Sequence, residues 1–280
     1  MQSHYHIRLL EQAATLKSSV CFTIVFGSFV HAGHAQINES DTARFQLRTS
    51  LTGNYQTGNV SVLTVRSKLD FAIAPLPAIV LKSQNTSLYQ SFYNKEADND
   101  LFSRNYVYFN PHRALYPYLI GYLSTNFRRQ VRLRVFGGGG ITWQLLRRSN
   151  DVIKLSANLL YEYTRFNGAA FNLAKYNGHD HIAVWRCTAY IGGWDYLFQR
   201  HLRFYYDAYW QPAFDEPNNY RLQLDAGIDF PIWRGLNATA LYSFSHEHVV
   251  ALPVKQTDNI LSFGFNYNVR IPRNAKQFKQ

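Results

Sequence analysis

Cysteine is scarce in this chain of 280 residues, and long apolar runs are missing outside its N-terminal region. The two cysteines, Cys21 and Cys187, are too few for a disulfide framework or for a Cys-rich zinc pattern. Beyond the N-terminal region, no stretch is continuously apolar over the roughly 18 residues that a membrane-spanning helix needs. The mean hydropathy of −0.27 is also lower than a helical membrane protein would have. These shortages exclude a disulfide-rich scaffold and a helical membrane protein.

A concentrated patch of one charge is also lacking, although the formal net charge is +11. The Lys and Arg residues are scattered along polar strand faces and turns. Proteins that bind nucleic acid cluster such residues on one face or along one helix. We therefore expect no nucleic-acid partner.

Residues 1–35 have the pattern of a secretory signal peptide. Basic side chains, among them Arg8 and Lys17, precede an 11-residue apolar core at 20–30, which is too short to span a membrane. The small residues Gly33 and Ala35 occupy the −3 and −1 positions of a cleavage site before Gln36. A buried strand or helix is the alternative. We expect a cleaved segment at 1–35 and a barrel domain with a short C-terminal tail at 36–280.

The clearest periodic pattern lies in residues 202–211 and 220–230, where apolar and polar side chains alternate. A period of two indicates a strand with one apolar face. Residues 212–219 between these segments are rich in Pro and Asn, which are turn residues. Each arm has about the 9–11 residues that a tilted strand needs to cross a bilayer. The 16% aromatic content suits the interfacial girdles of a membrane barrel, and it would equally suit a sugar-binding β-sandwich.

The same alternation predicts twelve strands along the chain. They span about residues 45–55, 63–71, 78–92, 101–110, 114–126, 131–143, 153–164, 181–192, 202–211, 220–230, 237–245 and 261–270. The fifth is the least regular, because Pro117 removes a ladder donor. Twelve is an even number, as single-chain bacterial outer-membrane barrels require.

The connections between these strands alternate in length. Those after the third, seventh and eleventh strands are expected to be long, the first of them a charged loop at 93–100. Those after the second, fourth, eighth and tenth strands are expected to be short, and the tight turn after the first strand breaks the trend. This parity favours a barrel over a sandwich, since a barrel has different connections at its two ends.

These patterns predict an all-β fold, an antiparallel transmembrane β-barrel of about 12 strands of the outer-membrane type. In hydrocarbon every backbone N–H and C=O must be paired, and only a closed sheet leaves no edge. The apolar side of each strand then faces lipid and the polar side faces the lumen. The candidate lumen-lining residues are Arg48, Arg66, Lys68, Arg132, Arg134, Lys154, Glu162, Arg203, Asp207, Arg221 and Asp225. A soluble periplasmic β-sandwich that binds a ligand is the competing architecture.

The basic excess in this lumen set has two interpretations. Rings of Arg or Lys favour anions in a narrow pore. A barrel of about twelve strands is also small enough for long side chains to pair across the interior and plug it. Both interpretations stay open from the sequence.

Residues 51–59 read Leu-Thr-Gly-Asn-Tyr-Gln-Thr-Gly-Asn. This segment resembles the Gly-x-x-x-Thr-Gly-Asn opening of the salt-stress-induced outer-membrane proteins, a bacterial β-barrel family of unknown function. The later charged hairpin, the Gly-rich stretch at 136–140 and the aromatic last strand fit the same family, so the resemblance covers about residues 43–270. It implies a bacterial outer-membrane location, no established chemistry, and no functional residues to carry over.

Two histidine pairs stand beside expected outer loops. His179 and His181 end one loop, and His246 and His248 begin another. Imidazoles favour zinc or copper, and the alternative is that these are solvated loop histidines. We assign no metal ligand and no cofactor.

No catalytic constellation stands out. Ser245 and His246 are adjacent, and adjacent strand residues point to opposite faces. The glycines at 137–140 lack the Gly-Lys-Ser/Thr that completes a phosphate loop, and in a barrel strand they indicate a bend or close packing. We expect no enzyme, with an outer-membrane hydrolase as the less favoured alternative.

The expected role lies in the envelope of a Gram-negative bacterium, as structural support or a narrow porin-like conduit in the cell outer membrane. Its expected partners are membrane lipids and the outer-membrane assembly machinery, and we expect a monomer. A surface-binding role would use the loop after the seventh strand, where Phe166, Phe171 and Tyr176 either grip a glycan or partner or simply pack within the loop.

Overall fold

The computed structural model describes residues 37–58, 61–148 and 150–272. The strands are β1 (Ala43–Gln56), β2 (Val62–Leu76), β3 (Ile79–Phe92), β4 (Lys95–Phe109), β5 (Leu115–Asn126), β6 (Val131–Arg147), β7 (Asp151–Phe166), β8 (His181–Leu197), β9 (Leu202–Pro212), β10 (Tyr220–Trp233), β11 (Leu236–Glu247) and β12 (Thr257–Pro272). Two 3₁₀ helices, η1 (Ala174–Tyr176) and η2 (Phe198–Arg200), lie in the connections. No described helix has the length and apolar composition of a membrane span. The expected signal peptide at 1–35 and residues 273–280 of the expected tail lie outside the described residues.

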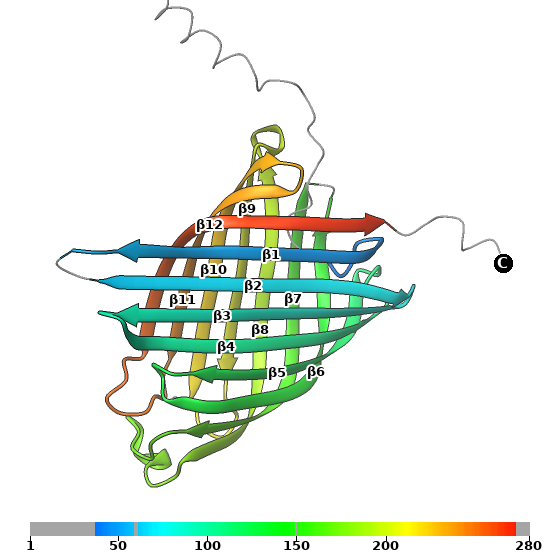
Figure 1. Cartoon of the computed structure of the whole chain (residues 1–280). Helices are drawn as coiled ribbons and strands as arrows, with labels where there is room; N and C mark the ends of the chain where they lie inside the picture. The colour runs from blue at the N-terminus through cyan, green and yellow to red at the C-terminus, as the bar shows by residue number, and fades with distance from the viewer. Residues whose placement is uncertain (1–36, 59–60, 149, 273–280) are drawn as a thin grey trace, which may run out of the picture. The chain divides into compact units, whose positions relative to one another are not determined.

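The twelve described strands form one closed antiparallel barrel. Each strand pairs with its neighbours in the chain, and β1 pairs with β12 to close the sheet. At this seam Thr49 faces Tyr267 and Leu51 faces Phe265. Figure 1 shows β1 between β12 and β2. Closure leaves no unpaired strand edge, so the predicted barrel is confirmed and the two stacked sheets of a sandwich do not form.

Apolar side chains cover the outside of the barrel, and charged side chains fill its inside. Leu159 in the middle of β7 is 49% exposed and Leu261 in β12 is 61% exposed, whereas Arg203 and Asp229 are fully buried. A protein that folds in water has the opposite arrangement, with charged groups rarely buried. The apolar surface is the one that a transmembrane β-barrel of the outer-membrane type presents to lipid.

The two ends of the barrel have different connections. At one end, Arg234 and Gly235 alone link β10 to β11, and residues 77–78 alone link β2 to β3. At the opposite end, residues 167–180, 213–219 and 248–256 link β7 to β8, β9 to β10 and β11 to β12. We call these the short-turn end and the long-loop end. In outer-membrane barrels the short turns are periplasmic and the long loops extracellular.

The prediction of a charged loop at 93–100 is wrong, because only Tyr93 and Asn94 connect β3 to β4. Both residues have positive φ angles, 48° and 61°, as a tight hairpin turn requires. Pairing resumes at once with Phe92 opposite Lys95. The first residues of β4 are polar on both faces, so they have no apolar alternation to mark them as strand.

The fifth strand forms despite its proline. The β4–β5 pairing ends with Tyr108 opposite Tyr118, so at Pro117 the described register has a partner only in β6, which is Ile141. Proline is tolerated where the ladder to one neighbouring strand ends, because a missing N–H costs least there.

The glycines of β6 allow close packing against β7. A Cβ atom on Gly138 would lie 2.1 Å from the Leu159 carbonyl oxygen, and one on Gly140 would lie 2.3 Å from the Ala157 carbonyl oxygen. A side chain at either position would force the two strands apart. Close packing, one of the two expected uses of this stretch, is what the structure shows.

Candidate functional site in the lumen

The charged residues expected in the lumen meet partners from distant strands. Arg48 of β1 lies 3.4 Å from Asp229 of β10, and Lys68 of β2 lies 3.9 Å from Asp225 of β10. Strands that are not neighbours in a closed barrel are able to make such contacts only through the interior. By these contacts and their burial, the structure places ten of the expected residues inside, namely Arg48, Arg66, Lys68, Arg134, Lys154, Glu162, Arg203, Asp207, Arg221 and Asp225.

Arg132 does not join this interior set, and its assignment to the lumen is corrected. The side chain is exposed, while Val131 and Arg134 are buried. A β-bulge shifts the β6–β7 register between Val131 and Leu133. A bulge inserts one unpaired residue and so breaks the alternation of faces. The prediction assumed strict alternation from Arg134 back to Arg132, and therefore assigned both side chains to the same face.

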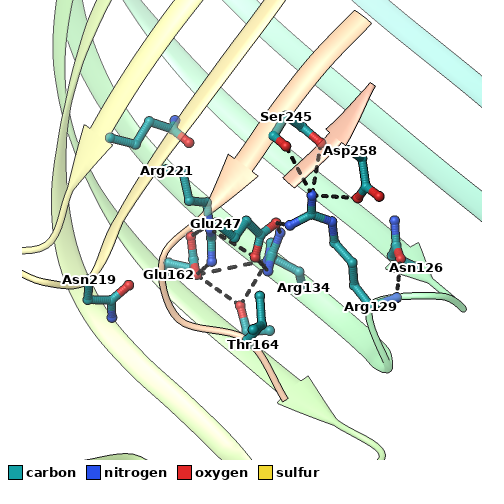
Figure 2. Close-up of polar contacts among 12 residues, drawn as sticks. Asn126, Arg129, Arg134, Glu162, Thr164, Asn219, Arg221, Ser245, Glu247 and Asp258 are labelled. Carbon is teal, nitrogen blue, oxygen red and sulfur yellow. Dashed lines mark hydrogen bonds and ion pairs between the residues drawn. The ribbon is translucent and has the colours of Figure 1, made fainter. Parts of the chain in front are cut away.

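A network of arginines and carboxylates fills the lumen near the long-loop end (Figure 2). Glu162 of β7 accepts two hydrogen bonds from Arg221 of β10 and one from the Thr164 hydroxyl. Arg134 of β6 donates two hydrogen bonds, each 2.9 Å, to Glu247 of β11. Paired donors that match a carboxylate in this way give the strong, geometrically specific form of ion pair.

The same network reaches the connection between β5 and β6. Arg129 donates to the Ser245 hydroxyl at 2.9 Å and to Asp258 of β12 at 2.7 Å. Its backbone N–H donates to the Asn126 side-chain oxygen at 2.6 Å, which fixes the turn that carries it. Strands β5, β6, β7, β10, β11 and β12 are therefore tied together across the interior.

The long loops cover this network with a small apolar cluster of their own. Phe171 and Ala251 come from different loops, pair as an isolated β-bridge and are both buried. Tyr176 and Phe166 pack in the same cluster. Of the two interpretations of this loop, packing within the loop region is the one that the structure shows for these aromatic side chains, since burial removes them from contact with a partner.

A short lead segment, residues 37–42, occupies the short-turn end. Glu39 is 3% exposed and accepts hydrogen bonds from Lys154 at 2.6 Å, from the Tyr116 hydroxyl at 2.8 Å and from Lys82 at 3.4 Å. Burial alone would raise the pKa of the Glu39 carboxyl, but the two ammonium groups outweigh it and hold that pKa well below its usual range. The Ser40 carbonyl accepts a further bond from Arg147 at 2.9 Å.

Sequence reasoning missed the lead segment, because one carboxylate in a polar stretch has no periodic signal. Ile37 packs at the same end against a buried aromatic cluster that includes Tyr108, Tyr116 and Tyr118. Apolar and ionic contacts together hold the segment inside the barrel rather than beside it.

Between the lead segment and the long-loop network lies a cavity of about 230 Å³. Arg104 of β4 projects into it and donates to the Tyr209 hydroxyl at 2.6 Å. The Arg104 guanidinium lies 4.7 Å from the Tyr209 ring centroid and 5.7 Å from those of Phe102 and Tyr122. Arg104 falls in a predicted strand, yet it was not among the expected lumen residues.

The two histidine pairs remain separate in the structure. The ring centroids of His179 and His181 are 6.4 Å apart, and those of His246 and His248 are 6.3 Å apart. Tyr220 stacks on both rings of the second pair. Within the described part of the chain, no three His, Cys, Asp or Glu side chains gather as a metal site would need.

Ser245 and His246 do not form a nucleophile–base pair. The Ser245 hydroxyl accepts from Arg129 in the interior, while Nδ1 of His246 lies 2.9 Å from the Thr257 hydroxyl on the neighbouring strand. A nucleophile and its base must be within hydrogen-bond reach of each other. The arrangement thus offers charge pairing and a cavity, and no hydroxyl activated by this histidine.

Comparison with known proteins gives a family and a set of distant structural neighbours. A family model described as "Protein of unknown function, DUF481" matches residues 39–269. No curated protein matches the chain. The translocator domain of autotransporter NalP from Neisseria meningitidis is 13% identical and has a TM-score of 0.41, with 93% of this chain and 95% of that chain covered. The NanC porin is 9% identical with a TM-score of 0.42 and coverage of 82% and 100%, and OmpT, an outer membrane protein of Vibrio cholerae, is 8% identical with a TM-score of 0.39 and coverage of 84% and 100%.

Proposed function

Because the chain belongs to the DUF481 family, whose description gives no function, we propose a role from the geometry itself. The protein is a structural β-barrel of the bacterial outer membrane whose lumen is closed at rest, and it catalyses no reaction. One observation carries this proposal. Ion pairs cross the interior near the long-loop end, and residues 37–42 fill the short-turn end. Both mouths are therefore narrowed by contacts that the fold itself makes.

The apolar exterior supports the location in the outer membrane, where lipid hydrocarbon contacts side chains such as Leu159 and Leu261. Its partners are then membrane lipids and the assembly machinery that inserts such barrels, and the closed sheet needs no second copy. Membrane fractionation followed by a gel-mobility shift on heating tests this proposal. A band in the outer-membrane fraction that shifts on boiling supports it, and recovery from the periplasm without a shift contradicts it.

Planar-bilayer recording tests the closed lumen. The purified full-length protein should insert and give no current steps at neutral pH, because Glu39 and its lysine partners lie across one mouth and ion pairs such as Arg134–Glu247 lie across the other. Frequent current steps from the unmodified protein would contradict the closed lumen and show an open pore instead.

A narrow pore that prefers anions is the second candidate function, and the lead segment favours it. Residues 37–42 belong to no strand, and Glu39 is the carboxylate that ties them to Lys82 and Lys154, whereas Asp41 pairs with Arg270 at the rim. Loss of the Glu39 anchor would expose Lys82 and Lys154 at the mouth, and fixed ammonium groups favour anions. This function would be established by current steps that appear only after the lead segment is released. Their reversal potential in a salt gradient should indicate selectivity for anions.

We also propose that the protein belongs with the salt-stress-induced outer-membrane proteins. The resemblance rests on the β1–β2 hairpin, where Gly53 leaves only 2.3 Å between an added Cβ and the Thr64 carbonyl oxygen and where Gly58 has a φ of 119°. Protein levels that rise when cells are moved to higher NaCl would support this proposal, and levels unchanged by NaCl would contradict it.

A further inference from the structure

The cavity in the middle of the lumen contains a guanidinium group without a carboxylate partner. Arg104 donates to the Tyr209 hydroxyl and lies next to the Tyr106 hydroxyl. Within the described residues, no carboxylate oxygen lies within the 4.0 Å of an ion pair with it. The Arg104 side chain is partly buried, so its guanidinium loses part of its hydration without gaining an ionic partner, which is unfavourable for a charged group. Aromatic faces recover only part of that cost, so the site as folded favours an anion from outside.

A second cation on the same wall is also incompletely satisfied. Arg66 of β2 is buried and donates one hydrogen bond, to the Ser243 hydroxyl at 3.0 Å, while its Nε–H has no partner. The register places Arg66 at the level of Asp100, nearer the long-loop end than Arg104. Buried donors without a partner are rare and need a reason, and a ligand in the cavity supplies one.

The charge of the cavity wall favours anions as a whole. Nine Lys or Arg side chains and six Asp or Glu side chains line it. Several of the carboxylates already have partners. Glu39 is paired with Lys82 and Lys154, and Asp207 accepts from the Tyr190 hydroxyl. Among the described residues that line the cavity, Arg104 and Arg66 are the two cations that form no ion pair within 4.0 Å.

The remaining surface of the cavity selects the kind of anion. Aromatic rings from Phe102, Tyr122 and Tyr209 surround the guanidinium, and Tyr106 and Tyr118 continue this wall. Small-molecule sites typically combine such apolar surfaces with a few fixed polar groups. The volume of about 230 Å³ far exceeds the roughly 10–15 Å³ that one water needs, and it suits a small molecule.

We propose that this cavity binds a small organic carboxylate. The Arg104 guanidinium pairs with the carboxylate of the ligand, and the surrounding aromatic rings contact its apolar part. A planar guanidinium matches a planar carboxylate through two parallel hydrogen bonds. This inference goes beyond the structural role, since binding depends on neither conductance nor location in a cell.

The test uses the full-length protein folded in a neutral detergent, with sodium benzoate and inorganic phosphate as separate probes at constant ionic strength. Isothermal titration calorimetry measures affinity, and saturation-transfer NMR confirms contact with the benzoate ring. Saturable benzoate binding is expected in the unmodified protein, with phosphate weaker. Arg104→Gln should weaken benzoate binding at least tenfold. Arg132→Gln is the matched control, because it removes the same charge from an exposed position outside the lumen, and it should bind as the unmodified protein does.

Folding of each variant is checked by the gel-mobility shift on heating. If Arg104→Gln fails to fold, Arg104→Lys keeps the charge but loses the paired donors, and it should still weaken binding severalfold. No saturable binding of benzoate, equal loss in Arg104→Gln and Arg132→Gln, or unchanged binding in a folded Arg104 variant would each overturn the proposal. Binding of phosphate in preference to benzoate would overturn the organic carboxylate as well.

Discussion

Glu39 of the lead segment lies 2.6 Å from the Lys154 ammonium group of β7, 115 positions further along the chain. The pair is buried at the short-turn end of the barrel, and Lys82 of β3 approaches the same carboxylate at 3.4 Å. Buried ion pairs add little when replaced as a whole, yet removing one partner is costly because it leaves the other charge unpaired. Among the contacts that hold the lead segment, we therefore expect the ion pairs of Glu39 to matter most.

Replacing Glu39 by Gln should release the lead segment. Lys154 and Lys82 would lose their carboxylate, and breaking a buried pair costs about 3–5 kcal/mol, part of which the protein avoids by moving residues 37–42 out of the mouth. Planar-bilayer recordings of Glu39→Gln should show current steps at least tenfold more often than the unmodified protein, with anion preference.

Asp41→Asn is the matched control for this experiment. Asp41 lies in the same segment but pairs with Arg270 at the partly exposed barrel rim. The Asp41→Asn variant loses the same charge but leaves the ion pairs of Lys154 and Lys82 intact. Its recordings should therefore stay as silent as those of the unmodified protein. Equal activity of both variants would show that general loosening, and not the Glu39 anchor, opens the mouth.

The pH dependence of this anchor follows from the direction of its pKa. The pKa of Glu39 lies well below its ordinary value of 4.5 in the folded protein. A carboxyl with a lowered pKa gives stability that is complete above its unfolded pKa and is lost only as the pH falls through the folded pKa. Recordings of the unmodified protein should therefore be equally silent at pH 7 and pH 5. Opening between these two values would contradict the assignment of Glu39 as the charged anchor.

Glu162 should be the most sensitive carboxylate at the long-loop end. It is buried and approached by Arg221, by Arg186 at 3.2 Å and by Arg134 at 4.0 Å. Glu162→Gln would leave three guanidinium groups without their shared partner, so the free energy of unfolding should fall by about 3–5 kcal/mol. Urea unfolding in lipid vesicles, followed by tryptophan fluorescence, measures this change.

Asp180→Asn provides the comparison for Glu162. Asp180 pairs with Arg165 at 3.2 Å, but both side chains are about half exposed. Solvent-exposed pairs contribute little, because water screens them and ordering the side chains costs entropy. The Asp180 variant should unfold like the unmodified protein. If Glu162→Gln also had the same free energy of unfolding as the unmodified protein, the buried network would not stabilise the barrel.

The sequence was sufficient for the barrel because lipid contact imposes a simple rule on each strand. Residues such as Leu159 and Leu261 face outwards at every second position, and this alternation needs no knowledge of neighbouring strands. The rule fails where it is locally broken. The bulge beside Arg132 reverses the face, and the polar start of β4 hides the strand between Lys95 and Asp100.

The alternation of residues in a strand does not predict the interior contacts, because these depend on which strands face each other after closure. Arg48 meets Asp229 across 181 positions of sequence, and nothing in either strand specifies the other. Glu39 and Arg104 are single charged residues in otherwise ordinary segments. Their roles follow from the space around them, which exists only in the closed barrel.

The lipid-facing exterior can be tested by moving one charge. Leu159 lies at the middle of β7 with its side chain exposed, and Phe214 is similarly exposed in the connection between β9 and β10. An arginine at the bilayer midplane of a β-barrel costs roughly 2–4 kcal/mol, whereas one near the interface costs about 0–1 kcal/mol. Leu159→Arg should therefore lower the free energy of unfolding in lipid vesicles by roughly 2–4 kcal/mol, and Phe214→Arg should change it little.

The comparison of these two variants separates burial in lipid from exposure to water. Both replace an exposed apolar side chain by arginine, so the introduced charge is the same and the main difference between the variants is its position along the barrel. If Leu159→Arg proves as stable as Phe214→Arg, water and not hydrocarbon surrounds the middle of β7. The closed sheet would then belong to a soluble barrel, since the backbone pairing described above is compatible with either solvent and only the outward-facing side chains distinguish them.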